Sequence, residues 1–261
     1  MKTKLYPDLA SRIYSVWHRH VKVYTKHFVS NAFPPCVEPM IFLGGIGLGL
    51  GQYISQIGGL NFMQFLASGL LVTSAMFTSA YECTYGTFIR LEFDKIYDSM
   101  LAAPISVYDL IIGEIIWAGT KGFFFSLAVA MIFVLFRVLE PSTLLLAPIA
   151  GLFTGLMFGT LSLLVTSFVK NINAFNFYFT GVISPTFFFT GVVFPIENLP
   201  AFIRPLAEIF PLTHTVRLSR LLVMPERHYS SLLFYDLAYI ALFVTVIGFF
   251  AVHNLKKRLI D

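Results

Sequence analysis

Charged residues are absent from long stretches of this chain. No Asp, Glu, Lys or Arg occurs at positions 39–81, 122–136, 141–169, 171–196 or 237–252. Ionised side chains are costly in the hydrocarbon core of a bilayer, so such stretches indicate membrane spans. A helical span needs about 20 apolar residues to cross about 30 Å of hydrocarbon. The pattern therefore predicts several spanning helices in a chain of 261 residues.

Turn residues and isolated charges divide the apolar stretches into six predicted spans. These spans are expected at residues 32–55, 62–81, 108–136, 143–169, 174–194 and 229–252. Pro34, Pro35 and Pro39 fall near the start of the first span and are expected to bend or restart that helix. Glycines spaced by four, in the first span and at positions 151, 155 and 159, predict faces where helices pack closely.

Two segments outside the predicted spans also have a helical pattern. Residues 5–28 carry apolar side chains every three or four positions, with basic residues on another face. This pattern is typical of an amphipathic helix lying in the headgroup plane, although a solvated segment is the alternative. Residues 195–228 hold apolar pieces that are too short to cross a bilayer, with prolines between them. Two short helices dipping into the outer interface are predicted there.

Composition supports an integral membrane protein. Of the residues in the chain, 57% are hydrophobic and only 12% are charged, whereas about a quarter of the residues in a soluble domain are charged. We therefore interpret residues 31–261 as one all-helical membrane domain, preceded by an interfacial segment at residues 1–30. A net charge of +4 without long basic runs makes a nucleic-acid partner unexpected. The two cysteines do not indicate a disulfide framework.

The distribution of basic residues predicts the orientation. If both termini lie on one side, twelve Lys and Arg residues fall in segments on that side and five on the other. Basic residues concentrate in the cytoplasmic segments of membrane proteins. Six spans with both termini in the cytoplasm are therefore expected.

The interior of the third predicted span carries charged residues. Glu114 and Lys121 are seven positions apart, so they share a helix face but lie about 10 Å apart along the axis, too far for a direct bond. Each is expected to face a partner on another helix or a water-filled cavity. Glu82, at the inner end of the second span, is expected at the depth of Glu114. These residues are candidates to line or gate a polar passage; structural polar contacts with a snorkelling lysine are the alternative.

Residues 87–103 mix charged and apolar side chains, which is typical of a short helix at the membrane surface. Docking to a cytosolic partner and a solvated connector both fit this pattern. The sequence has no Walker A motif, no Gly-x-Ser-x-Gly and no His-Glu-x-x-His. The histidines have no metal-ligand spacing, and His214 is interpreted as a hydrogen-bonding residue. The chain is therefore not expected to be an enzyme or to bind a metal or ATP.

Several motifs resemble the permease subunits of ABC-2 type transporters. These are Phe189–Pro195, Leu199–Pro200 and Pro211–Arg220. The segments Phe65–Gly69, Thr73–Met76 and Gly113–Lys121 are also similar to the nodulation-factor export subfamily. The resemblance extends over nearly the whole chain.

The resemblance implies an N-terminal interfacial helix, six spans and a re-entrant helical pair on the outer side after the fifth span. It implies two copies of this chain working with two cytosolic ABC ATPase subunits, which would bind ATP and Mg²⁺ while this chain holds no cofactor. It also implies export of an amphiphile, such as a lipo-oligosaccharide, a lipid-linked glycan or a drug, across the lipid of the bacterial inner membrane.

The resemblance also implies roles for particular residues. The surface helix becomes a coupling helix, with ATPase contacts at Arg90, Glu92, Phe93, Asp94, Lys95 and Asp98. The candidates for the translocation path are Glu82, Glu114, Trp117 and Lys121. The outer helix motif contains Pro195, Pro200, Pro211, His214, Arg217 and Arg220, and its two arginines are expected to meet anionic head groups or to anchor the helix in phospholipid.

Two other classes of function stay open. One is an ion-driven secondary transporter that uses Glu82, Glu114 and Lys121 as its ion path. The other is an integral membrane enzyme that modifies a lipid, against which the absence of carboxylate and histidine clusters argues. A neighbouring gene for an ABC ATPase would favour export over both.

Overall fold

A computed structural model describes residues 7–54, 56–57, 60–223 and 232–260. These residues are helical apart from turns and a short antiparallel ribbon, β1 (Gln56–Ile57) with β2 (Leu60–Asn61). Five helical segments among them are long and apolar enough to cross a membrane: Phe28–Gly51, Phe62–Phe93, Val107–Leu135, Thr143–Phe168 and Leu233–Ile260. The structure thus agrees with an all-helical integral membrane protein.

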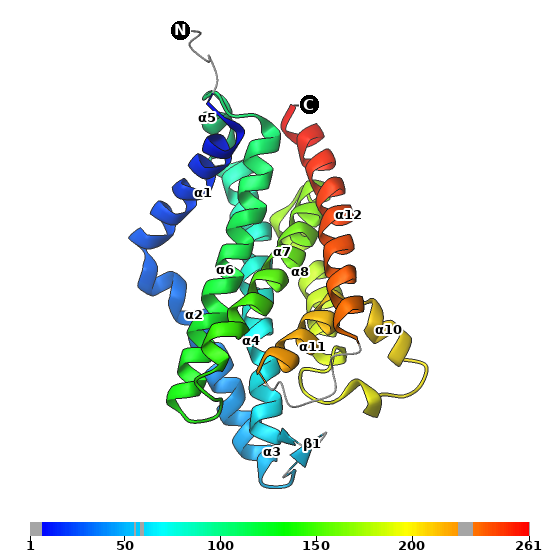
Figure 1. The fold of residues 1–261 in the computed structure, drawn as a ribbon. Helices are drawn as coiled ribbons and strands as arrows, with labels where there is room; N and C mark the ends of the chain where they lie inside the picture. The colour runs from blue at the N-terminus through cyan, green and yellow to red at the C-terminus, as the bar shows by residue number, and fades with distance from the viewer. Residues whose placement is uncertain (1–6, 55, 58–59, 224–231, 261) are drawn as a thin grey trace.

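Three long helices form the centre of the bundle. They are α4 (Phe62–Tyr81), α6 (Val107–Leu135) and α7 (Thr143–Phe168). The helix α12 (Leu233–Ile260) packs against α7 on one side, while α1 (Leu9–Lys26) and α2 (Phe28–Phe42) lie on the other (Figure 1). The start of α1 and the end of α12 lie at the same end of the bundle, together with α5 (Ile96–Leu101) (Figure 1).

Glycines allow α6 and α7 to approach closely. A Cβ atom on Gly155 would lie 2.5 Å from the backbone oxygen of Ala118 and 3.0 Å from the Cα of Gly119. The predicted packing face at Gly151, Gly155 and Gly159 is therefore confirmed. In the first span, a Cβ on Gly47 would lie 2.5 Å from Sδ of Met63, whereas a Cβ on Gly45 or Gly49 would meet no atom of the described residues within 4 Å.

The first predicted span begins earlier than its prolines suggested. Helix α2 starts at Phe28 and contains Pro34, Pro35 and Pro39. It continues through a π-helical segment, η1 (Leu43–Leu48), into α3 (Gly49–Gly51). The break in the chain lies at His27 instead. A proline removes one amide donor from a helix, and here Ser74 donates to the Pro35 carbonyl at 3.0 Å in place of the amide that Pro39 lacks. The expectation that the prolines restart the helix is therefore wrong.

The second span is longer than predicted, and the surface helix after it is shorter. Helix α4 continues through two π-helical segments, η2 (Glu82–Gly86) and η3 (Ile89–Phe93), as far as Phe93. A left-handed backbone conformation at Lys95, with φ of 52°, then turns the chain into α5. The surface helix predicted at residues 87–103 is thus reduced to six residues.

The fifth predicted span is a shorter helical segment. It consists of η4 (Ile172–Ala174), α8 (Phe175–Tyr178), η5 (Phe179–Ile183) and α9 (Ser184–Phe189). The segment ends before Gly191, which has φ of 87°, a conformation that glycine adopts without strain.

Three short helices follow: η6 (Ile196–Asn198), α10 (Arg204–Ile209) and α11 (Pro211–Val223). Pro225, Arg227 and the predicted start of the sixth span at residue 229 lie outside the described residues. The last long helix, α12, runs past the predicted end at residue 252 to Ile260.

Candidate functional site

A buried network of charged side chains joins α4 to α6. Arg90 donates from Nη1 to Oε1 of Glu82 at 2.7 Å and from Nη2 to Oε2 of Glu114 at 2.9 Å. Lys121 donates to Oε2 of Glu82 at 2.8 Å. Two cations therefore balance two carboxylates inside the bundle, which reduces the penalty of removing them from water.

Two further residues connect this network to neighbouring helices. Tyr97 of α5 donates its hydroxyl to Oε1 of Glu114 at 2.6 Å. Burial and the nearby Glu114 carboxylate raise the pKa of Tyr97, so the phenol keeps the proton that it donates. His20 of α1 places Nε2 3.0 Å from the same Oε1, at ion-pair distance although not aligned as a hydrogen bond. Glu114 is thus contacted from three other helical segments.

The network confirms that Glu114 and Lys121 have their partners on another helix. The two residues do not bond each other in the structure. Glu82 and Glu114 lie close enough for one guanidinium, that of Arg90, to bridge them. Trp117, another candidate for the path, is buried and stacks on His20 with ring centroids 5.7 Å apart.

The predicted coupling residues separate into two groups. Arg90 was expected at an ATPase contact but lies in the interior, because η3 extends the second span through it. Glu92 pairs with Arg258 of α12 at 2.7 Å. The remaining candidates are exposed in or directly before α5, at the end of the bundle that holds the start of α1 and the end of α12: Phe93, Asp94, Lys95 and Asp98. These four side chains are open to a partner, and Glu92 is partly exposed beside them.

The helix α1 packs on α6 through specific contacts. Val16 is buried against Gly113, where a Cβ atom would lie 2.5 Å from Cγ1 of Val16. Trp17 donates its indole N–H to the hydroxyl of Thr120 at 3.0 Å. Part of the stripe expected to face lipid thus faces α6, while Leu9 and other apolar residues of α1 stay exposed.

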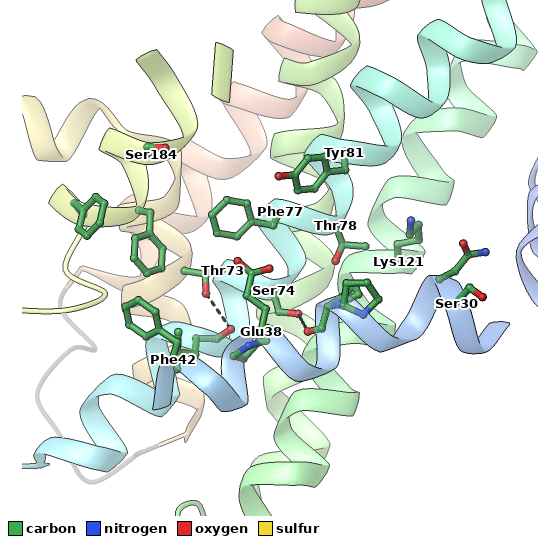
Figure 2. A pocket seen from close by; sticks show the side chains of 17 residues that line it. Ser30, Glu38, Phe42, Thr73, Ser74, Phe77, Thr78, Tyr81, Lys121 and Ser184 are labelled. Atoms are coloured by element: carbon green, nitrogen blue, oxygen red, sulfur yellow. Dashed lines mark hydrogen bonds between the residues drawn. The ribbon is translucent and has the colours of Figure 1, made fainter. Parts of the chain in front are cut away.

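A cavity of about 470 Å³ opens between α2, α4 and α9. Figure 2 shows Glu38 of α2 reaching into it, with Phe77 and Thr78 of α4 above and Lys121 to one side. Aromatic rings line its apolar part, including Phe187 of α9. Lys121 connects the cavity to the charge network, because it lines the cavity and its ammonium group donates to Glu82.

Sequence reasoning missed Glu38. The residue lies near the middle of the candidate span Phe28–Gly51, and its side chain is exposed. Its signal was available, since an acidic residue inside a predicted span is a candidate functional residue. The surrounding prolines predicted a helix start at this position, so Glu38 was not considered as part of a span.

The outer helix motif forms a second polar cluster. Arg217 pairs with Glu208 of α10 at 2.7 Å and with Asp236 of α12 at 2.7 Å. His214, fully buried, places Nδ1 2.8 Å from Asp236 and Nε2 3.1 Å from the Glu208 carbonyl. Burial alone lowers the pKa of Arg217, but the bonds to the two carboxylates outweigh it and raise that pKa overall.

The arginines of this motif do not have the roles that the sequence suggested. Arg217 ties α11 to α10 and α12, and Arg220 is buried, bonds the Gly191 carbonyl and lies over the Phe65 ring at 3.8 Å. Neither is placed as a lipid anchor in the described structure. Pro211 begins α11, while Pro195 and Pro200 flank η6. Glu208 and Asp236 are the partners that the sequence did not reveal, because they come from other helices.

Comparison with known proteins supports the resemblance seen in the motifs. A model of the ABC-2 type transporter family matches residues 11–224. The chain is 31% identical over 207 residues to Nodulation protein J of Rhizobium leguminosarum bv. trifolii and 30% identical over 207 residues to that of Rhizobium meliloti (strain 1021), covering 79% of each chain in both cases. It is 23% identical over 202 residues, 77% of this chain and 78% of the relative, to the Inner membrane transport permease YadH of Escherichia coli (strain K12). The chain therefore belongs to the ABC-2 type transporter family.

Proposed function

We propose that this chain is the transmembrane subunit of an ABC exporter that moves an amphiphile across a bacterial inner membrane. The observation that supports this function most strongly is the family match over residues 11–224. The structure adds a cavity of about 470 Å³ beside the buried charges, with aromatic and polar walls. Such a cavity suits a molecule with an apolar chain and a polar head group.

In this proposal, two copies of the chain assemble with two cytosolic ATPase subunits that bind ATP and Mg²⁺. The exposed residues around α5 form the ATPase contact, namely Phe93, Asp94, Lys95 and Asp98. These residues lie at the same end of the bundle as the start of α1 and the end of α12 (Figure 1). This arrangement supports a common cytoplasmic side for α5, the start of α1 and the end of α12. The helical segment α8–α9 serves as the fifth of six crossings in chain order, and α10–α11 form the outer re-entrant pair.

The charge network provides a path from the ATPase contact to the cavity. Tyr97 of α5 bonds Glu114, Arg90 bridges Glu114 to Glu82, and Glu82 bonds Lys121 at the cavity wall. A displacement of α5 when the ATPase subunits close would strain these buried bonds. Bonds between charged groups in the interior tolerate little stretching without large cost, so helices that share them move together.

A secondary transporter driven by ions is the second candidate function. The structure offers it less support, because Glu82, Glu114 and Lys121 are all engaged in ion pairs with other residues. Transport that persists after the ion gradients are collapsed, but stops without ATP, would exclude it.

The double substitution Asp94→Lys with Asp98→Lys tests the proposed function. Both side chains are exposed and take part in no ion pair among the described residues, so reversing their charge leaves the fold intact. We expect co-purification of the ATPase subunit to fall by about tenfold or more, since like charges across an interface cost several kcal/mol. ATP-dependent release of co-purifying amphiphile from proteoliposomes should fall with it.

The matched control is Glu140→Lys, an exposed acidic residue in the loop between α6 and α7. It should leave co-purification and transport at the wild-type level. Wild-type behaviour of the double variant in both measurements would remove α5 from the ATPase contact.

A further inference from the structure

The Glu38 carboxylate has no counter-charge in the described structure. Glu38 makes no ion pair or hydrogen bond with any described residue, although it lies near the middle of a candidate span. A carboxylate at such a depth is costly unless it faces water or a partner. Glu38 faces the cavity, so its partner is to be sought among the molecules that enter it.

The one cation on the described cavity wall is already neutralised. Lys121 donates to Glu82 at 2.8 Å, and Arg90, deeper in the bundle, serves both Glu82 and Glu114. In that network two cations balance two carboxylates. Glu38 is therefore the one acidic side chain on the described cavity wall, and no cation of that wall is left to balance it.

The backbone of α2 adds further hydrogen-bond acceptors to the same wall. Pro34 and Pro35 lack the amide groups that would bond the carbonyls of Ser30 and Asn31 in a regular helix. Both of these residues line the cavity. The carbonyls of Ser30 and Asn31 therefore lack their usual helical donors, on a wall that also carries the Ser30 hydroxyl and the Asn31 side-chain amide.

A buried hydroxyl marks the same cavity independently. Thr78 of α4 lines the cavity and is only 4% exposed, yet its Oγ1 has no hydrogen-bond partner in the described structure. Buried polar atoms are almost always satisfied, so an unpaired one calls for an occupant. In Figure 2 Thr78 lies between Phe77 and Lys121, on the wall that Glu38 faces.

Another part of the cavity wall is aromatic. Phe187 packs edge-on against Phe42 with ring centroids 5.1 Å apart, and it contacts Phe77 at 6.1 Å and Phe188 at 5.1 Å. These rings come from α2, α4 and α9. They form a surface for an apolar chain beside the polar wall.

We propose that this cavity binds an amphiphile whose head group donates hydrogen bonds and carries no negative charge. Hydroxyl, amide or ammonium groups of the head meet Glu38 and the neighbouring carbonyls, and the apolar chain packs on the ring cluster of Phe42, Phe77, Phe187 and Phe188. An uncharged glycolipid fits this description, whereas a glycan carried on a lipid phosphate does not. The inference rests on the proposed function, in which the cargo is an amphiphile.

Three synthetic probes test the inference with the full-length chain in phosphatidylcholine nanodiscs. They share one alkyl chain with a photoreactive diazirine and differ in the head group, which is glucoside, primary ammonium or phosphate. Labelling of peptides that contain Phe77 or Phe187 is measured by mass spectrometry against probe concentration. We expect half-maximal labelling by the glucoside and the ammonium at concentrations about tenfold below that of the phosphate, because one hydrogen bond to a charged group contributes roughly that factor.

The substitution Glu38→Gln removes the charge and keeps the shape. The substitution should raise the concentration for half-maximal labelling by the ammonium probe about tenfold. The phosphate probe should then label at the same concentration as the glucoside probe. Glu140→Gln, in an exposed loop and not among the residues that line the cavity, should change the labelling by none of the three probes. A wild-type preference for phosphate, equal labelling by all probes, or a preference that survives in Glu38→Gln would each overturn the inference.

The outcome separates this inference from the proposed function. Probe labelling needs no ATPase, so it can be measured separately from transport. If the chain labels with the expected order of head groups but transports none of the probes together with its ATPase partner, the cavity assignment is supported and export is contradicted. Transport of the probes without that order would contradict the cavity assignment and leave export standing.

Discussion

Single buried charges carry much of the structural information in this protein. Lys121 and Glu82 are 39 positions apart, yet their side chains bond at 2.8 Å with little exposure of either. Breaking a buried pair leaves a charge without compensation, and that costs far more than the net contribution of the intact pair. The individual residues of the network should therefore be sensitive to neutralisation and tolerant of substitutions that keep the charge.

Lys121→Met is expected to destabilise the folded chain by about 3 kcal/mol, because Arg90 is then the one cation paired with Glu82 among the described residues. Thermal unfolding in detergent measures the loss, and transport should fall in parallel. Lys121→Arg preserves the charge and should retain more stability. Adding Glu82→Gln to Lys121→Met should recover part of the loss, since the two residues interact directly. Unchanged stability and transport in Lys121→Met would make this lysine a snorkelling residue only.

At the scale of helices, close contact between α6 and α7 organises the bundle. The backbones approach at Gly122, Gly151 and Gly155, where a Cβ atom on Gly155 would lie 3.1 Å from the Cα of Gly122. Helices in a membrane gain little from the hydrophobic effect between them, so close van der Waals packing supplies much of their association. A side chain at this interface would push the two helices apart.

Gly155→Ala is expected to destabilise the bundle by about 1–3 kcal/mol through overpacking. The comparison is Gly181→Ala, because a Cβ at Gly181 would meet no described atom within 4 Å. The first variant should unfold at a lower temperature in detergent, and the second should match the wild type. Equal unfolding temperatures for both variants would show that α6 and α7 separate more easily than their backbone contact implies.

At the scale of the whole molecule, the number of crossings determines where the termini lie. Five segments reach the length of a span, and an odd number of crossings would place the two ends on opposite sides of the membrane. The start of α1 and the end of α12 nevertheless share one end of the bundle (Figure 1). The crossing that we propose for α8–α9 would reconcile the two observations.

Cysteine labelling tests this topology. Single cysteines at Leu9, Tyr53 and Ile260 are placed in a background with Cys36→Ser and Cys83→Ala, since all three positions are exposed. An impermeant maleimide should label Leu9→Cys and Ile260→Cys only after the cells are opened, and Tyr53→Cys in intact spheroplasts. Labelling of the two end positions from opposite sides would rule out six crossings.

The sequence by itself determined the features that depend on local composition. Stretches without charge identified five of the six predicted spans, and glycines spaced by four identified the face of α7 that packs closely. Transfer into lipid and backbone approach are properties of short segments, so a local pattern can record them. Motifs in the last third of the chain were sufficient to indicate the family.

Only the tertiary structure decided which polar groups meet. Arg90 faces inward because α4 continues past Tyr81, and Glu38 becomes a cavity residue because α2 begins before its prolines. Such pairings depend on where each helix ends and how it is rotated against helices that are remote in the chain. No local pattern records that rotation, so the network around Glu114 and the cavity at Glu38 emerged only when the helices were packed together.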